Sequence, residues 1–125
     1  MILGIDFGLK NIGLALSAGE LVEPLGHLKS LSLDKTISRI NQLCQDHQIE
    51  KIVIGLPQGS LKLRIEQFTT QLKKVINLPI IFQDETLTSQ EAVKKSLHQP
   101  LKKRQQSQHA IAAALILQAY LDSRF

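Results

Sequence analysis

The chain has 125 residues, a length that suits one domain with its own hydrophobic core and excludes two ordinary domains. We therefore expect a single domain over residues 1–125. Hydrophobic residues make up 43% and charged residues 21%, as in soluble globular proteins, and the formal net charge is +4. This basic excess is compatible with a polyanionic partner and equally with a solvated, lysine-rich face.

Several features predict a cytoplasmic protein that makes no membrane contact. Cys44 is the only cysteine, which excludes an intramolecular disulfide and suits a reducing compartment. The first strand pattern begins at Ile2, where a signal peptide would otherwise stand. The longest apolar run, Ala110–Leu117, is far too short to cross a bilayer.

The first half of the chain predicts three strands and a helix. An apolar strand is expected at residues 2–7, with its hairpin partner at 13–17 and a tight turn containing Gly and Asn between them. A short third strand is expected at 25–28. Asp34 is the expected N-cap of a helix with apolar residues at helical spacing.

The second half alternates strands and helices. We expect a strand at 51–57, a helix at 61–76, a strand at 78–83 and a helix from Thr88 or Ser89 to Leu97. Residues 98–108 are polar and contain Pro100, which predicts a mobile loop before a final helix at 109–121. The pattern indicates an α/β fold: a mixed five-stranded sheet with helices on both faces and 51–55 and 79–83 as its buried parallel part.

Asp6 stands out because it lies within the first apolar strand. Strand alternation places it on one face with Gly4, and together with Gly8 this leaves room for a group to approach the carboxylate. A buried, unpaired Asp would cost several kcal/mol, so it needs a cation, a metal or hydrogen-bond donors. The plainer alternative is an Asp that accepts a hydrogen bond from a turn amide of the hairpin.

A second acidic feature, Asp84 and Glu85, follows the strand at 78–83. These residues would lie at the carboxyl end of a parallel strand, where ligands bind in open α/β sheets. Alternatively, Asp84 is a turn residue and Glu85 a solvated charge. Carboxylates at the ends of two central strands make a candidate site for a hard divalent cation.

Four segments, in this order, carry a resemblance to a known family: "GIDFGLKNIGLALS", "IVIGLPQG", "DETLTSQEA" and "AIAAALILQAYLD". With them the whole chain resembles the YqgF/RuvX family of small nucleases, described as Holliday junction resolvases or pre-16S rRNA nucleases. The resemblance implies a ribonuclease H-like fold. The first segment alone also resembles the phosphate loop of actin-like ATPases, but that fold needs a duplicated pair of domains and more than 125 residues.

The resemblance implies a metal-dependent phosphodiester hydrolase with Mg²⁺ or Mn²⁺ held by three acidic groups. The first would be Asp6 and the second Glu85, with Asp84 beside it. The third position, before "AIAAALIL", is His109 in this chain. Lys10 would contact a phosphate. The implied partner is structured RNA or branched DNA, in a pre-ribosomal particle or free, and the implied state is a monomer or weak homodimer.

The chain departs from the family pattern at Asn11, Thr86 and His109. The departure at His109 matters most, because no Asp or Glu lies between Ala92 and Leu121. Imidazole can bind a metal or relay a proton, and a nitrogen ligand would favour Mn²⁺ over Mg²⁺. Alternatively, His109 only makes a hydrogen bond, and the chain binds nucleic acid without cutting it.

Two further expectations concern nucleic-acid contacts. Lys102, Lys103 and Arg104 are expected to close on phosphates from the loop before the final helix, or else only to solubilise that loop. Phe7 and Phe82 are placed at core spacing, and aromatic residues are 4% with no Trp, which argues against a platform that stacks bases.

Overall fold

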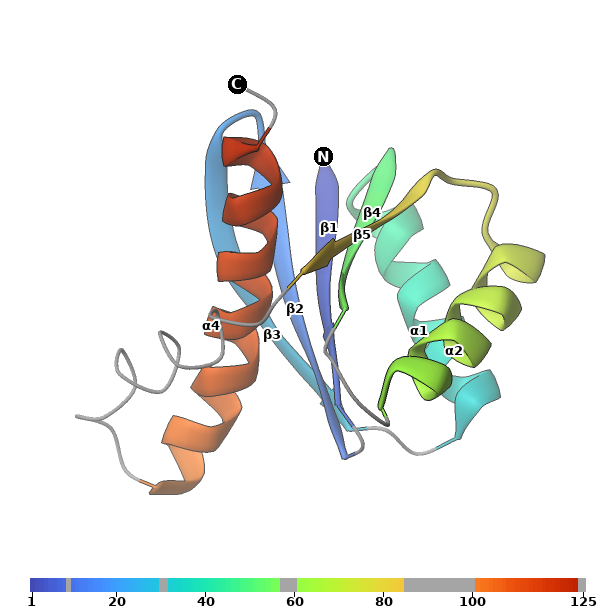
Figure 1. Ribbon diagram of the computed structural model, residues 1–125, viewed down its shortest axis with the longest axis horizontal. Coiled ribbons are helices and arrows are strands. Elements are labelled where there is room, and N and C mark those ends of the chain that lie inside the picture. Colours follow the sequence, from blue (N-terminus) through green and yellow to red (C-terminus); the bar gives the residue numbers. More distant parts are fainter. Residues whose placement is uncertain (9, 30–31, 57–60, 85–100, 124–125) are drawn as a thin grey trace.

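A computed structural model describes residues 1–8, 10–29, 32–56, 61–84 and 101–123, with only the backbone for 101–107. Its centre is a five-stranded sheet in the order β3-β2-β1-β4-β5. The strands are β1 (Ile2–Phe7), β2 (Asn11–Ala18), β3 (Leu21–Lys29), β4 (Lys51–Leu56) and β5 (Ile80–Asp84). Two helices, α1 (Leu33–Asp46) and α2 (Leu61–Val75), cover one face, and α4 (Leu101–Asp122) covers the other (Figure 1).

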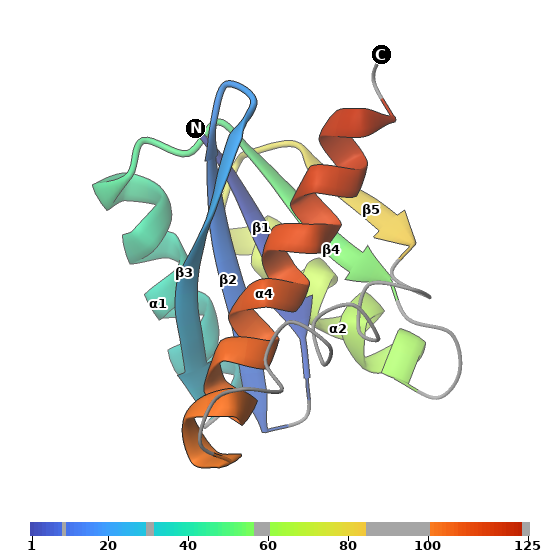
Figure 2. The same ribbon diagram turned by 90° about the vertical axis from the view of Figure 1, so that its left-hand side faces the viewer.

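The sheet is mixed because of how its strands are connected. β1, β2 and β3 form an antiparallel meander, with Gly19 in the left-handed region (φ 64°) at the turn from β2 to β3. β4 and β5 pair in parallel with β1 and β4, and the helices α1 and α2 supply the crossovers that parallel pairing requires. The carboxyl ends of β1, β4 and β5 therefore share one edge of the sheet. Figure 2 shows α4 lying across the other face.

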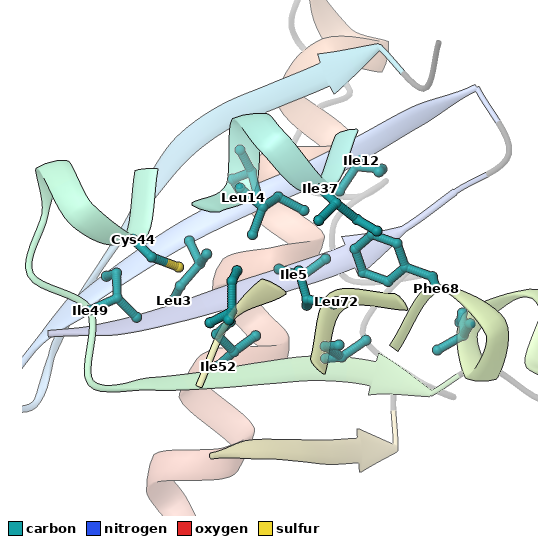
Figure 3. Packing of buried hydrophobic residues seen from close by; sticks show 14 residues of the cluster. Leu3, Ile5, Ile12, Leu14, Ile37, Cys44, Ile49, Ile52, Phe68 and Leu72 are labelled. Carbon is teal, nitrogen blue, oxygen red and sulfur yellow. The ribbon is translucent and has the colours of Figure 1, made fainter. Parts of the chain in front are cut away.

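The larger core lies between the sheet and the α1/α2 layer (Figure 3). Alternation along β1 sends Leu3 and Ile5 into this core, and both are fully buried. The ring of Phe7 packs on Phe68 of α2, with centroids 5.0 Å apart. Cys44 of α1 is buried in the same core, as expected for a cysteine at a helical core position.

The smaller core lies between the sheet and α4. Ala113, Ile116 and Leu117 are buried against Val53 of β4, which is consistent with the expected helices on both faces of the sheet. Small side chains on α4 allow the helix to approach the sheet closely. Among the described segments, no helix combines the length and the apolar character needed to span a bilayer.

Three boundaries in the first half of the chain differ from the expectation. The hairpin partner is longer than predicted, because β2 spans Asn11–Ala18 and not only 13–17. The third strand is longer than predicted, Leu21–Lys29, because backbone pairing with β2 overrides the charged and proline residues that break its apolar pattern. The N-cap of α1 is Ser32 and not Asp34. Its hydroxyl oxygen accepts a hydrogen bond from the backbone N–H of Lys35 at 3.2 Å. Asp34 instead lies in the first turn, where a negative charge also favours the helix.

The second half contains two corrections and one untested expectation. The predicted loop at 98–108 is wrong from Leu101 onward, because α4 begins there. The stretch after Pro100 consists mostly of good helix formers, so propensity outweighs polarity. The expected burial of 79–83 is also wrong, because β5 is the last strand in the order and Phe82 is 40% exposed. The expected helix from Thr88 or Ser89 lies outside the described residues.

A first prediction concerns Cys44, whose burial raises the pKa of the thiol from 9.0 to about 11. The folded protein therefore disfavours the thiolate, and this thiol contributes stability that is complete below pH 9 and lost between pH 9 and about 11. We expect the free energy of unfolding to fall less steeply over that range in Cys44→Ala than in wild type. Chemical denaturation at several pH values measures both slopes, and equal slopes would contradict the assignment.

Candidate functional site

Asp6 lies near the carboxyl end of β1 on the face covered by α4. Gly4, two residues earlier on that face, is so close to α4 that an added Cβ would lie 3.0 Å from the carbonyl oxygen of Ala113. The Asp6 side chain is 13% exposed, so its carboxylate is largely removed from water. The structure thus confirms the alternation that places Asp6 opposite the buried apolar face of β1.

His109 is the group that faces this carboxylate. Its Nδ1 lies 3.9 Å from Oδ2 of Asp6, and its side chain is 32% exposed. This separation is too long for a hydrogen bond, which needs about 2.7–3.2 Å. His109 lies about two turns inside α4, and not at the helix start as predicted, so the helix end does not point at Asp6. Within the described chain it is the only basic side chain at ion-pairing distance from Asp6.

Gly13 explains why these two groups meet. It pairs with Asp6 in the β1–β2 register, and a Cβ built on it would overlap the backbone carbonyl of His109. Only a glycine lets the α4 backbone lie directly on β2 at this point. Sequence reasoning did not single out Gly13. A glycine opposite Asp6 in the hairpin would indicate this close contact, but the pairing can be identified only once the register of β1 and β2 is known.

Asp84 belongs to the opposite face of the sheet from Asp6, the face covered by α1 and α2. In the parallel register Leu56 pairs with Asp84, and Gly55 pairs with Gln83. Ile81 packs on the α4 side and Ile80 on the α1/α2 side, so alternation places Asp84 with Ile80 and away from Asp6. Asp84 lies at the predicted edge of the sheet, but the structure does not bring it and Asp6 to the same face.

The remaining predicted residues are described only in part. Lys10 is exposed in the connection between β1 and β2. Lys102, Lys103 and Arg104 belong to the first turns of α4, and their side chains lie outside the described part. Glu85 also lies outside the described residues.

The donor set fits a divalent cation in two respects. A largely buried carboxylate that makes no hydrogen bond with the described residues gains from a cation, and its oxygens are ligands for Mg²⁺ and Mn²⁺. The 3.9 Å gap between Oδ2 and Nδ1 is below about 4.2 Å, twice a typical metal–ligand distance, so one ion can contact both atoms. Among the described residues no group of three acidic, His or Cys side chains is close enough to hold an ion.

The chain matches a protein family described as "RuvX: Holliday junction resolvase" over residues 1–123. The chain belongs to the RuvX family. This confirms the resemblance seen in the sequence and places the chain among nucleases and resolvases, enzymes that hydrolyse phosphodiester bonds.

Curated relatives support the assignment over nearly the full length. A protein of Syntrophomonas wolfei named "Putative pre-16S rRNA nuclease" is 39% identical, with 97% of this RuvX chain and 93% of the relative aligned. A protein of the same name from Sulfurihydrogenibium is 38% identical, with 97% and 89% aligned.

Solved structures confirm the ribonuclease H-like fold. Thermus thermophilus RuvC in complex with a Holliday junction substrate matches with a TM-score of 0.65 at 12% identity, covering 98% of this chain and 95% of RuvC. The Holliday junction resolvase of fowlpox virus matches with a TM-score of 0.61 at 14% identity, covering 99% of both chains.

A second prediction follows from the contact between Gly13 and α4. Gly13→Ala should destabilise the protein by about 1–3 kcal/mol, as overpacking does, and should move His109 away from Asp6. Gly4→Ala is the matched control, because its Cβ would press on Ala113 and Leu117 without touching His109. Urea denaturation and the chemical shifts of the His109 ring report the two effects. A His109 ring that shifts equally in both variants would contradict the role of Gly13.

Proposed function

We propose that this RuvX protein is a divalent-metal-dependent nuclease that acts on structured nucleic acid, either in 5′-end processing of pre-16S rRNA or in cleavage of branched nucleic acid. One observation carries the proposal: a largely buried Asp6 faces His109 at the carboxyl edge of the sheet. The names of the full-length relatives support rRNA as the substrate, and the shared fold of the resolvases is compatible with branched DNA.

In this proposal Asp6, Glu85 and His109 hold the metal. β1 pairs with β2 at Asp6 itself and with β4 as far as Ile5, so the sheet holds the backbone of Asp6 in place. Glu85, which directly follows β5 in the sequence and lies outside the described residues, is proposed as the second carboxylate. A bound divalent ion would supply the charge that activates water and stabilises the leaving oxygen.

The protein's own groups would position the reacting phosphate and restrict water. His109 stays uncharged while its nitrogen serves as a ligand, and α4 covers one side of the carboxylate. Lys10 would neutralise a phosphate beside the scissile bond, and Lys102, Lys103 and Arg104 would contact phosphates further along. Processing of rRNA would place the protein in the cytoplasm, as a single-domain monomer or weak homodimer on a pre-ribosomal particle.

A third prediction tests the carboxylates. Asp6→Asn and Glu85→Gln remove a charge at almost constant volume, so each should lower cleavage by about 100-fold or more while the fold persists, since even outer-shell partners of a metal contribute 10–100-fold. Asp122→Asn is the control, because Asp122 is an exposed carboxylate on the same helix as His109 and accepts a hydrogen bond from Gln118. Cleavage of a pre-16S RNA fragment and circular dichroism measure the two properties. Full activity in both variants would contradict the assignment of Asp6 and Glu85 as metal ligands.

A second candidate function is a relative that binds nucleic acid without cutting it. The observation that favours it is the histidine at the third acidic position, which removes one negative charge from the site. Mg²⁺ is held mainly by carboxylates and water, so such a site binds it less tightly than a three-acid site would.

A fourth prediction separates the two functions through His109. With an imidazole ligand, wild type should cleave better with Mn²⁺ than with Mg²⁺, because affinity for nitrogen ligands rises along the transition series. His109→Asp should raise Mg²⁺-supported cleavage, and His109→Ala should lower cleavage with both metals. Initial rates with each metal give the answer. Wild type and His109→Ala that cut alike would remove His109 from the chemistry, whereas no cleavage in wild type or His109→Asp would favour the binding-only function.

A further inference from the structure

Two neighbouring pockets flank the beginning of α1 on the side of the sheet away from His109. The first, here called the basic pocket, has a volume of about 470 Å³ between β3 and α1. It is lined by Leu28, Lys29, Lys35, Thr36, Ser38 and Arg39. The second, of about 300 Å³, lies between α1 and α2, where Ser32, Arg64 and Phe7 contribute to its lining. Thr36 lines both pockets, so they adjoin at this residue.

The charge of the lining points to an anionic occupant. Lys29, Lys35 and Arg39 line the basic pocket and Arg64 lines the second one, and none of the described lining residues is acidic. Asp34, in the first turn of α1, lines neither pocket. The positive end of the helix dipole adds to the field, because both pockets lie at the N-terminal turns of this 14-residue helix.

Thr36 gives an independent sign of a ligand. The residue is 5% exposed, and its Oγ1 has no hydrogen-bond partner in the described part of the protein. Such a hydroxyl costs about 1–3 kcal/mol when it stays unsatisfied. Its backbone N–H already donates to the carbonyl of Ser32, so the hydroxyl is the group that remains for an acceptor oxygen.

The pockets lie at the same end of the sheet as Asp6. Phe7, the neighbour of Asp6, lines the second pocket, while Leu28 and Lys29 pair with Ile12 and Asn11 at the end of β2 next to the β1–β2 turn. Within the plane of the sheet, the basic pocket is therefore offset from Asp6 by about two strand spacings, roughly 10 Å, and it lies on the opposite face. A strand of nucleic acid that passes over the edge could reach both.

We propose that the two pockets bind successive phosphates of the nucleic-acid strand that leaves the cleavage edge, an inference that rests on the proposed nuclease function. Arg64 and Ser32 contact the phosphate nearer to Asp6. Lys35 and Arg39 contact the next phosphates, with Thr36 Oγ1 donating to a phosphate oxygen between them. These contacts go to the backbone, so they position the strand and do not read its sequence.

The main test uses a double variant with a matched control. Lys35→Gln/Arg39→Gln removes two exposed cations that line the basic pocket, and Lys73→Gln/Lys74→Gln removes two exposed cations from the last turn of α2, which line neither pocket. Binding to a single-stranded RNA and to a DNA of the same sequence is measured in EDTA over a range of salt. The pocket variant should lower the slope of log affinity against log salt by about 1.4, at about 0.7 for each lost phosphate contact, and the control should change it little. An unchanged slope in the pocket variant, or an equal loss in the control, overturns the proposal.

The variant Thr36→Val separates a role in binding from a role in stability, because the RNA affinity and the unfolding temperature should change in opposite directions. Val has a similar shape and lacks the hydroxyl, so the free protein should unfold at a higher temperature. If Oγ1 donates to a phosphate, RNA affinity should nevertheless fall roughly 2- to 10-fold, the equivalent of one hydrogen bond. A more stable variant with unchanged affinity overturns the role of Thr36.

Different results would contradict the nuclease function and the phosphate-binding pockets. If wild type cleaves RNA but the Lys35→Gln/Arg39→Gln variant binds like wild type, the pocket proposal is wrong and the nuclease function stands. If no metal supports cleavage but the pocket variant still shows the smaller slope of log affinity against log salt, the nuclease function is wrong. The pockets then remain a phosphate-binding surface.

Discussion

The close contact between α4 and the β1–β2 hairpin determines the geometry of the candidate site. Gly13 has no side chain, so the carbonyl of His109 rests directly on β2. Because Gly13 pairs with Asp6, this contact also brings the imidazole to 3.9 Å from the carboxylate. The small residues of α4, such as Ala113, continue the close packing along the sheet. Site geometry and core packing are thus consequences of one constraint.

The arrangement separates two kinds of charge at one edge of the sheet. Asp6 lies on the α4 face, where the proposed cation would compensate its charge, while the cationic side chains of the basic pocket lie on the α1/α2 face. A nucleic-acid strand carries phosphates at regular intervals, so one phosphate could contact the proposed cation at Asp6 while others contact the basic pocket. In the proposed arrangement, the first turns of α1 and α2 would contact the substrate in addition to packing on the sheet.

Much of the fold could be predicted from local patterns. The apolar alternation of β1 predicts the face of Asp6, and apolar residues at helical spacing predict the helix α1, whose buried residues line the larger core. The exposure of Phe82 could not be predicted, because an apolar run does not reveal that its strand is last in the sheet. The position of His109 inside α4 could not be predicted, because the polar residues before it and Pro100 are typical of a loop. The face of Asp84 depends on the register of β5, which no local pattern specifies.

The central claim is that Asp6 and His109 bind one metal ion together. Anomalous X-ray diffraction from crystals soaked in Mn²⁺ tests it directly, without any assay of activity. We expect a single anomalous peak at about 2.1 Å from both Oδ2 of Asp6 and Nδ1 of His109, and no peak at this position in Asp6→Asn. A site that stays empty at saturating Mn²⁺, or an ion held by carboxylates alone with the His109 ring turned away, would contradict the account.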